Sequence, residues 1–171
     1  MGAPLNRDQI IALVIQLEGG LVDNPADPGG RTNMGITQRY LDNARTHDAT
    51  LPATVDALTV AQVTQLYQTD QWATVDGDNL PAAIATLAFD GAVNEGPGTA
   101  VMLLQQALGI LADGKMGSGT RGAVNGANWA KLAAEYAARR AVHYATIGAG
   151  KSVFELGWMR RLITVYTAAV K

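Results

Sequence analysis

The sequence predicts a mostly α-helical fold that carries one small β-hairpin element. Apolar residues recur at helical spacing through most of the 171-residue chain, beginning with the segment from Ile10 to Leu17. Glycine and proline interrupt these helical segments at short breaks, and none of the breaks is long enough to be an interdomain linker. One segment, Arg31 to Ile36, instead fits a short strand that can form half of a hairpin.

The first helix is expected to end at the Gly-Gly pair that follows Glu18, because glycine readily adopts the left-handed conformation found just past helix ends. Asn6 or Asp8 can cap the start of this helix with a side-chain oxygen. Residues 21–30 are rich in Pro, Gly, Asn and Asp, which favour turns. Glu18 therefore lies in the last helical turn, directly before a polar loop.

The middle of the chain carries three signals for the start of a helix. Thr37 can cap a short helix that runs through Ala44, and Thr59 with Gln62 forms a capping box for another. Pro81 suits the first position of a third helix. Apolar residues at helical spacing follow the last two signals: Val60, Val63, Leu66 and Tyr67 in one helix, and Ile84, Leu87, Ala88 and Phe89 in the other.

The C-terminal part is expected to hold further helices between glycine-containing breaks. Gly109 stops the first of them, and Asp113-Gly114 forms a turn. The expected helical segments are 99–108, new pieces that start at Thr120 or Asn128, the Ala-rich segment 129–147 and a last helix over 157–170. Without a fixed-period repeat, the whole chain 1–171 is expected to form a single domain.

The composition excludes several classes of protein. A formal net charge of -2 and a pI near 5.6 argue against nucleic-acid binding through bulk electrostatics. The chain has no cysteine, so it forms no disulfides and has no thiolate chemistry. The apolar run near the N-terminus is too short to span a bilayer, and no basic region with a cleavage site precedes it. The absence of a long exposed apolar stripe favours a monomer.

Glu18 is the first candidate for chemistry. A carboxylate at a helix C-terminus faces the negative end of the helix dipole, which disfavours its ionised form, and a neutral carboxylic acid can protonate the leaving oxygen of a glycoside. Glycosidases usually pair such an acid with a second carboxylate, and Asp23 and Asp27 lie in the following loop. Thr32 can hold a water molecule with its hydroxyl. The alternatives are a solvated Glu18, a turn-capping Asp27 and a Thr32 that is only a strand residue.

A second group of polar and aromatic residues can contact a sugar. Asp90, Asn94 and Glu95 carry amide or carboxylate groups that hydrogen-bond acetamido and hydroxyl groups, although Asp90 can equally be a buried residue that ties helices together. Three aromatic residues can stack on sugar faces or pack in the core: Tyr67, Trp72 and Trp158. Arg139 and Arg140 are expected on a solvated helix face.

No metal or cofactor site is predicted. The Asp-Gly-Asp-Asn stretch at 76–79 lacks the remaining ligands of a calcium loop, so a polar turn before Pro81 is the better interpretation. His47 and His143 do not have metal-ligand spacing. Serine-nucleophile, Walker and dinucleotide motifs are absent from the sequence.

Several motifs together resemble glycoside hydrolase family 108, the phage and bacterial N-acetylmuramidases. The stretch "EGG" followed by "DNPADPGGRTNMGIT" is similar to the family signature, and "LYQTDQW" resembles its Tyr-x-x-x-Tyr-Trp element. The stretches "FDGAVNEGPGTAVMLLQQALG" and "DGKMGSGT" resemble its predicted peptidoglycan-binding region, and "FELGWMRR" resembles its closing element. One departure is Leu21, which stands where the family has a tyrosine after Glu-Gly-Gly.

The resemblance implies a lysozyme-like helical domain, with a catalytic-motif half over 1–88 and a helical half over 89–171. It implies that Glu18 is the catalytic acid. The spacing of Glu18, Asp27 and Thr32 is also similar to the Glu, Asp, Thr triad of phage-type lysozymes, with one residue fewer before the threonine. By that likeness Asp27 stabilises positive charge on the sugar or orients water, and Thr32 positions the attacking water.

The function implied is that of an endolysin, which hydrolyses the β-1,4 bond between N-acetylmuramic acid and N-acetylglucosamine in peptidoglycan strands. Asp90, Asn94, Tyr67 and Trp72 are the expected substrate contacts. The implied route is synthesis in the cytoplasm without a signal peptide and release to the cell wall by a separate pore-forming protein. Two alternatives stay open: a lytic transglycosylase, which uses a single Glu, and a non-catalytic wall-binding module.

Overall fold

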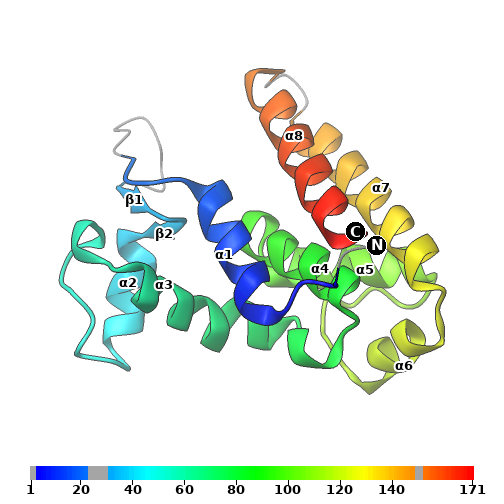
Figure 1. The fold of residues 1–171 in the computed structure, drawn as a ribbon, viewed down its shortest axis with the longest axis horizontal. Helices are drawn as coiled ribbons and strands as arrows, with labels where there is room; N and C mark the ends of the chain where they lie inside the picture. Colours follow the sequence, from blue (N-terminus) through cyan, green and yellow to red (C-terminus); the bar gives the residue numbers. More distant parts are fainter. Residues whose placement is uncertain (1–2, 23–30, 149–151) are drawn as a thin grey trace. The chain divides into compact units, whose positions relative to one another are not determined.

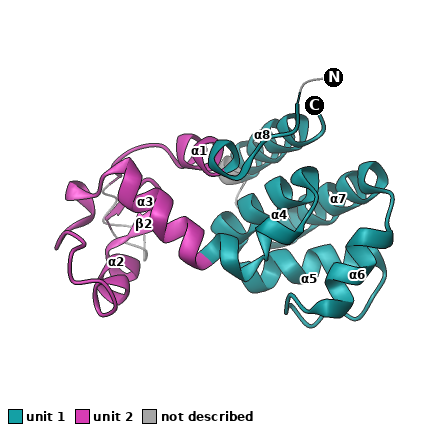
Figure 2. Ribbon diagram, turned by 60° about the horizontal axis from the view of Figure 1, so that its bottom comes forward, with its two compact units in different colours: residues 1–10, 71–171 teal, residues 11–70 magenta. Residues whose placement is uncertain are grey.

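A computed structural model describes residues 3–22, 31–148 and 152–171 of the chain (Figure 1). These residues contain eight α-helices and one two-stranded antiparallel sheet, so the predicted mostly α fold with a small hairpin is confirmed. The chain divides into two compact units, one formed by residues 11–70 and the other by 1–10 and 71–171 (Figure 2). The two halves expected from the sequence, 1–88 and 89–171, have a different boundary from these two units.

The helical segments of the unit 11–70 follow the predicted capping signals. Asn6 caps α1 (Arg7–Glu18), since its side chain accepts a hydrogen bond from the backbone of Gln9 at 2.9 Å. Thr37 caps the second helix, and Thr59 and Gln62 form the expected capping box. The elements with residues in this unit are α1 (Arg7–Glu18, which starts in the other unit), β1 (Thr32–Asn33), β2 (Ile36–Thr37), α2 (Gln38–Arg45), η1 (Val55–Ala57), α3 (Val60–Tyr67) and the π-helical turn η2 (Gln68–Trp72).

The hairpin of β1 and β2 is short, and the side chain of Asn33 connects it to the segment after α2. Thr32 pairs with Thr37 and Asn33 with Ile36 in the antiparallel register. The buried Asn33 side chain donates a hydrogen bond to the Val55 carbonyl at 2.8 Å. Two paired strands of this length do not hold together alone in water, so this tertiary bond helps to fix the position of the hairpin.

The unit formed by 1–10 and 71–171 is built around α4 (Ala82–Glu95), which is buried over nine consecutive residues. The helix packs against three others: α5 (Pro97–Leu108), α7 (Trp129–Ile147) and α8 (Ser152–Ala169). The shorter η3 (Gly77–Asn79) and α6 (Ser118–Gly126) complete the unit. The final helix starts five residues before the predicted Gly157, so this glycine lies inside α8 rather than at its start.

The connection from α5 to α6 is held by the buried side chain of Gln105. Its Nε2 donates to the Asp113 carboxylate at 2.8 Å and to the Thr120 hydroxyl at 3.0 Å, and its Oε1 accepts from the Gly114 backbone at 2.9 Å. Gly109 ends α5 in the left-handed conformation, as predicted. The hydrogen bonds of this one side chain therefore fix a loop that has no regular secondary structure.

Candidate functional site

Glu18 is the last residue of α1, and the chain leaves the helix at Gly19 with a φ of 77°. The residue is half-buried, and its Oε1 atom is shielded from solvent. Because α1 ends here, the carboxyl group sits at the negative end of the helix dipole, as predicted. The structure thus places a partly covered carboxyl group at a helix terminus, from which the chain continues toward the hairpin strand.

The hairpin turn between β1 and β2 lies directly against Glu18. Both turn residues have positive φ angles, 50° at Met34 and 80° at Gly35, which is the conformation of a tight two-residue hairpin. A Cβ atom added to Gly35 would overlap the Tyr67 hydroxyl and would lie 2.8 Å from Cγ and 3.0 Å from Cδ of Glu18. Only a residue without a side chain allows the turn to approach Glu18 this closely.

Tyr67 holds the same turn from the side of α3. Its hydroxyl donates a hydrogen bond to the Met34 carbonyl at 3.0 Å, and its side chain is 1% exposed. A sugar from solvent therefore meets little of the Tyr67 ring, which we expected to stack on substrate. The described geometry gives Tyr67 a different task, which is to fix the backbone that contacts Glu18.

Thr32 lies at the base of the loop that follows α1. Its backbone amide and carbonyl form a bridge with Val22, at 2.9 and 2.8 Å, and the residue is half-buried. These bonds fix the backbone of Thr32 in the same unit as Glu18. The other predicted member of the triad, Asp27, lies outside the described residues.

Asp90 is completely buried in α4 and is bonded to two guanidinium groups. Arg140 of α7 approaches it at 2.7 Å and Arg161 of α8 at 2.8 Å. Arg140 is itself completely buried and also contacts Glu95 at 2.6 Å, so its predicted place on a solvated face is wrong. This geometry favours the alternative interpretation of Asp90, a buried carboxylate that ties helices together.

Asn94 takes part in the same buried network. Its side-chain amide donates to the Tyr144 hydroxyl at 2.7 Å, and Arg140 donates to that hydroxyl at 2.8 Å. Burial raises the pKa of Tyr144 above its ordinary value, so this phenol stays neutral at physiological pH. The Asn94 side chain therefore serves a helix-to-helix contact in the described structure.

Trp72 is buried at 4% exposure and packs edge-on against Phe89, with ring centroids 5.5 Å apart. Its indole N–H donates to Asp78 at 3.0 Å. The polar stretch at 76–79 thus supplies a partner for a core tryptophan, and Asp76 in the same stretch pairs with Arg121 at 2.8 Å. These contacts fit the core role that was the alternative to sugar stacking.

The sequence reasoning missed the importance of the dipeptide Met34-Gly35. The residues favoured in such a turn are Asn-Gly, Asp-Gly or Gly-Gly, so Met-Gly is a weak hairpin signal, and only the fold reveals that the turn contacts Glu18 and Tyr67. The described residues thus bring three elements together at Glu18: the end of α1, the hairpin turn and the end of α3. Such a carboxyl group, fixed beside a rigid turn, is suited to proton transfer.

Two family models match the chain. Residues 11–96 match the family model described as glycosyl hydrolase 108, and residues 99–163 match a predicted peptidoglycan domain. Among solved structures, SagA of Brucella abortus is 34% identical and has a TM-score of 0.83, with 96% of this chain and 93% of that chain covered. Comparison with curated proteins gives no match.

Proposed function

Because the chain belongs to the glycosyl hydrolase 108 family, we propose that it hydrolyses the β-1,4 bond between N-acetylmuramic acid and N-acetylglucosamine, with Glu18 as the general acid. The chain is a glycoside hydrolase that acts on peptidoglycan, and its second matched region is a predicted peptidoglycan domain. The observation that carries the assignment to Glu18 is the close approach of the Gly35 turn to its side chain at the end of α1.

In the proposed reaction Glu18 gives its proton to the glycosidic oxygen while the sugar develops oxocarbenium character. The leaving sugar departs with that proton, and water adds to the anomeric carbon. Thr32 is proposed to position this water, which its fixed backbone beside Val22 supports. Asp27 is proposed to stabilise the positive charge or to orient the water.

One observation favours a second candidate, a lytic transglycosylase. Glu18 is the carboxylate that the described residues place beside the turn, and a transglycosylase needs a single acid because the muramic hydroxyl replaces water as nucleophile. The two reactions leave different products. Hydrolysis leaves reducing ends, whereas transglycosylation leaves 1,6-anhydro ends.

Mass spectrometry of purified peptidoglycan after digestion tests both points. We expect reducing ends from the natural protein and no soluble fragments from Glu18→Gln, which keeps the size of the side chain but cannot donate a carboxylic proton. Glu135→Gln is the matched control, because Glu135 lies on the exposed surface of α7, where its ion pair is with Arg139 one helical turn away. Anhydro ends would replace the hydrolase by the transglycosylase, and cleavage by Glu18→Gln at the natural rate would remove Glu18 from the mechanism.

The third possibility, a wall-binding module without catalysis, is distinguished by pelleting with insoluble peptidoglycan. We expect Glu18→Gln to pellet as the natural protein does, because the match to a peptidoglycan domain covers a different region, 99–163. Binding without cleavage by the natural protein would favour the module. With the proposed activity the protein would be bacteriolytic, as an endolysin is, and clearing of permeabilised cells measures this property. We also propose that the protein is a monomer, which light scattering tests.

The length and apolar character of a helix decide whether it can cross a membrane. Among the helices of the described residues, none has both the length and the apolar character needed to cross a bilayer.

A further inference from the structure

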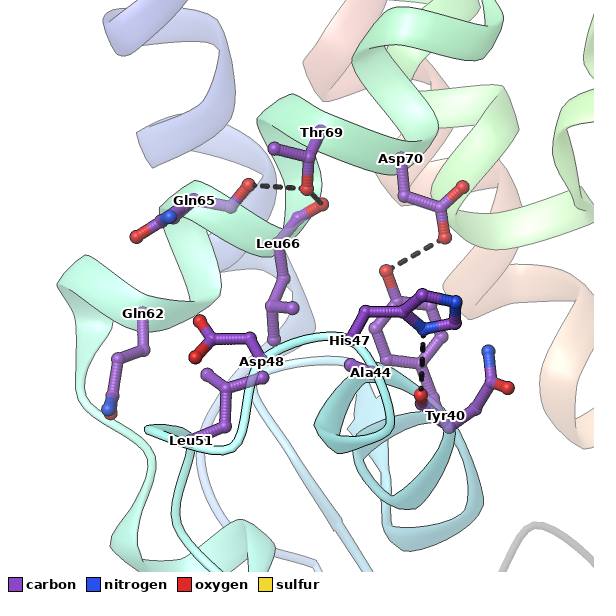
Figure 3. Close-up of a pocket in the computed structure, with 11 residues that line it drawn as sticks. Tyr40, Ala44, His47, Asp48, Leu51, Gln62, Gln65, Leu66, Thr69 and Asp70 are labelled. Atoms are coloured by element: carbon purple, nitrogen blue, oxygen red, sulfur yellow. Dashed lines mark hydrogen bonds between the residues drawn. The ribbon is translucent and has the colours of Figure 1, made fainter.

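A second concave site lies in the unit 11–70, between α2 and α3 (Figure 3). The pocket has a volume of about 400 Å³, and Glu18, Gly35 and Tyr67 are not among the residues that line it. Its apolar lining includes Leu51 and Leu66, which are 7% and 9% exposed. The pocket is therefore a built cavity with a partly apolar surface, and the proposed reaction at Glu18 does not use it.

Two carboxylates stand on different walls of this pocket, as Figure 3 shows. Asp70 accepts a hydrogen bond from the Tyr40 hydroxyl at 2.8 Å, which links the π-helical turn to α2. Asp48 accepts two bonds from Thr50, one from its hydroxyl at 2.6 Å and one from its backbone amide at 2.9 Å. Besides the two aspartates the lining includes one histidine, His47, but no lysine or arginine, so carboxylates outnumber basic side chains and the pocket favours a cation over an anion.

Asp48 is ionised at neutral pH. The hydroxyl of Thr50, and then its backbone amide, lower the pKa of the Asp48 carboxyl below its ordinary value because both bonds favour the charged form. The same two bonds hold the carboxylate in one orientation at the edge of the pocket.

Three side-chain amides also line the pocket: Asn43, Gln62 and Gln65. Amide side chains both donate and accept hydrogen bonds, so they match the amide groups of a peptide. The Gln62 carbonyl oxygen already accepts from Thr59 in the capping box, which fixes this side chain in place. A ligand that combines peptide groups, a short apolar side chain and a positive charge would satisfy each part of the lining.

We propose that this pocket binds the free amine of the diamino acid in a peptidoglycan stem peptide, with Asp48 and Asp70 as its anionic contacts. The proposal rests on the proposed function only in taking peptidoglycan as the source of the ligand. The free amine is the cationic group of a wall polymer that is otherwise neutral or anionic. A protein of net charge -2 gains no general attraction to such a polymer, so a local carboxylate pocket supplies it instead.

This assignment also predicts a preference among stem peptides. Cross-linking converts the amine of the diamino acid into an amide, which removes its positive charge and lengthens the peptide at that atom. The pocket is therefore expected to engage stems that are not cross-linked. The hydrolase would then act mainly where the wall is open or newly made.

Chemical-shift titration of the isotope-labelled full chain tests the pocket directly. The probe is the tripeptide N-acetyl-L-Ala-γ-D-Glu-L-Lys, and the comparison is the same peptide acetylated at the lysine Nζ. We expect shifts at the residues that line the pocket, and about fivefold weaker binding after acetylation or in Asp48→Asn or Asp70→Asn, as for a partly exposed ion pair. Asparagine keeps an oxygen for the bonds from Thr50 and Tyr40, so both variants retain the local structure.

The matched control is Asp42→Asn. Asp42 lies on α2 but outside the pocket, where it accepts from Gln38 at 2.8 Å, so this variant changes the net charge equally without touching the lining. Equal binding of the acetylated peptide, equal weakening by Asp42→Asn, or no shifts at the pocket would overturn the proposal. Shifts at the pocket from chitotriose but not from the peptide would also overturn it, in favour of a saccharide site.

The outcome does not depend on the proposed reaction. Cleavage that is lost in Glu18→Gln, together with a pocket that ignores the tripeptide, would refute the pocket and leave the hydrolase intact. Binding of the amine by a protein that cuts no glycan bond would refute the hydrolase and leave the pocket intact. The two proposals can therefore fail separately.

Discussion

Gly35 approaches Glu18 so closely that a single added carbon atom on Gly35 would lie 2.8 Å from the Glu18 Cγ. The close approach depends on a turn whose two residues both have positive φ. The position of the proposed acid is thus set by backbone that sits some distance away in the sequence.

Gly35→Ala is expected to destabilise the protein and to abolish cleavage. The new methyl group meets the Tyr67 hydroxyl and the Glu18 side chain at a φ of 80°, so we expect a loss of about 1–3 kcal/mol in the free energy of unfolding. Urea unfolding and peptidoglycan digestion measure the two effects. Gly20→Ala is the control, because a Cβ at Gly20 meets nothing within 4 Å. Similar losses in both variants would show that the contact with Glu18 is unimportant.

Tyr67→Phe is expected to lower activity more than stability. Loss of the bond to the Met34 carbonyl costs about 1 kcal/mol, while the ring continues to fill the core. The turn then contacts Glu18 less rigidly, so the pH dependence of cleavage should change along with the rate. An unchanged pH profile would assign Tyr67 to packing alone.

The double variant Gly35→Ala with Tyr67→Phe tests whether the two residues act on each other. Removing the hydroxyl makes room for the alanine methyl, so the penalty of Gly35→Ala should be smaller in the phenylalanine background. A double-mutant cycle from urea unfolding gives the coupling energy. Strictly additive penalties would contradict the overlap that the geometry requires.

Asp90→Ala is expected to be among the most damaging single substitutions. It leaves the buried guanidinium of Arg140 and the largely buried one of Arg161 without the carboxylate that bonds both, which costs about 3–5 kcal/mol. The exposed pair of Arg139 with Glu135 offers the control, since Arg139→Ala should cost no more than about 0.5 kcal/mol. Calorimetry of both variants measures the difference. A small loss in Asp90→Ala would show that Asp90 is not the centre of this network.

Because of a carboxylate in the loop that Gln105 holds, the stability of the folded protein should depend on pH in the acidic range. Hydrogen bonds from the Lys115 backbone and then from Gln105 lower the pKa of the Asp113 carboxyl in the folded protein. The carboxylate therefore contributes stability at pH values above its unfolded pKa of about 3.9, and this contribution is lost as the pH falls through the lower folded value. The difference in Tm between the natural protein and Asp113→Asn should narrow below about pH 4. A difference that stays constant to pH 2.5 would contradict this.

Local signals predicted most of the secondary structure. The capping box of Thr59 and Gln62, the Asn128 cap and the glycine after α5 each depend on residues within a few positions, so a single segment contains the whole signal. The sequence predicts that the last helix starts at Gly157, whereas α8 starts at Ser152. A glycine inside a long helix is tolerated when neighbouring helices hold it.

The site was predictable only in part, for the opposite reason. The end of α1 at Glu18 follows from local sequence, whereas the turn that contacts it comes from residues 34 and 35 and the support for that turn from residue 67. Arg140 was assigned to a solvated face because its bonds to Asp90 span 50 positions of the sequence. Contacts of this range are decided by the packing of helices, which periodicity does not specify.

The charged network inside the helical unit limits which substitutions this interior can accept during evolution. Asp90 and Glu95 are balanced by Arg140 and Arg161, so a replacement at one of these residues leaves the charge of another without its partner. Substitution of these residues one at a time is therefore expected to be harmful. Related sequences should either keep all of the charged residues or have apolar side chains of similar volume at all of these positions. An engineer who wants a more heat-resistant variant should likewise replace these positions as one block.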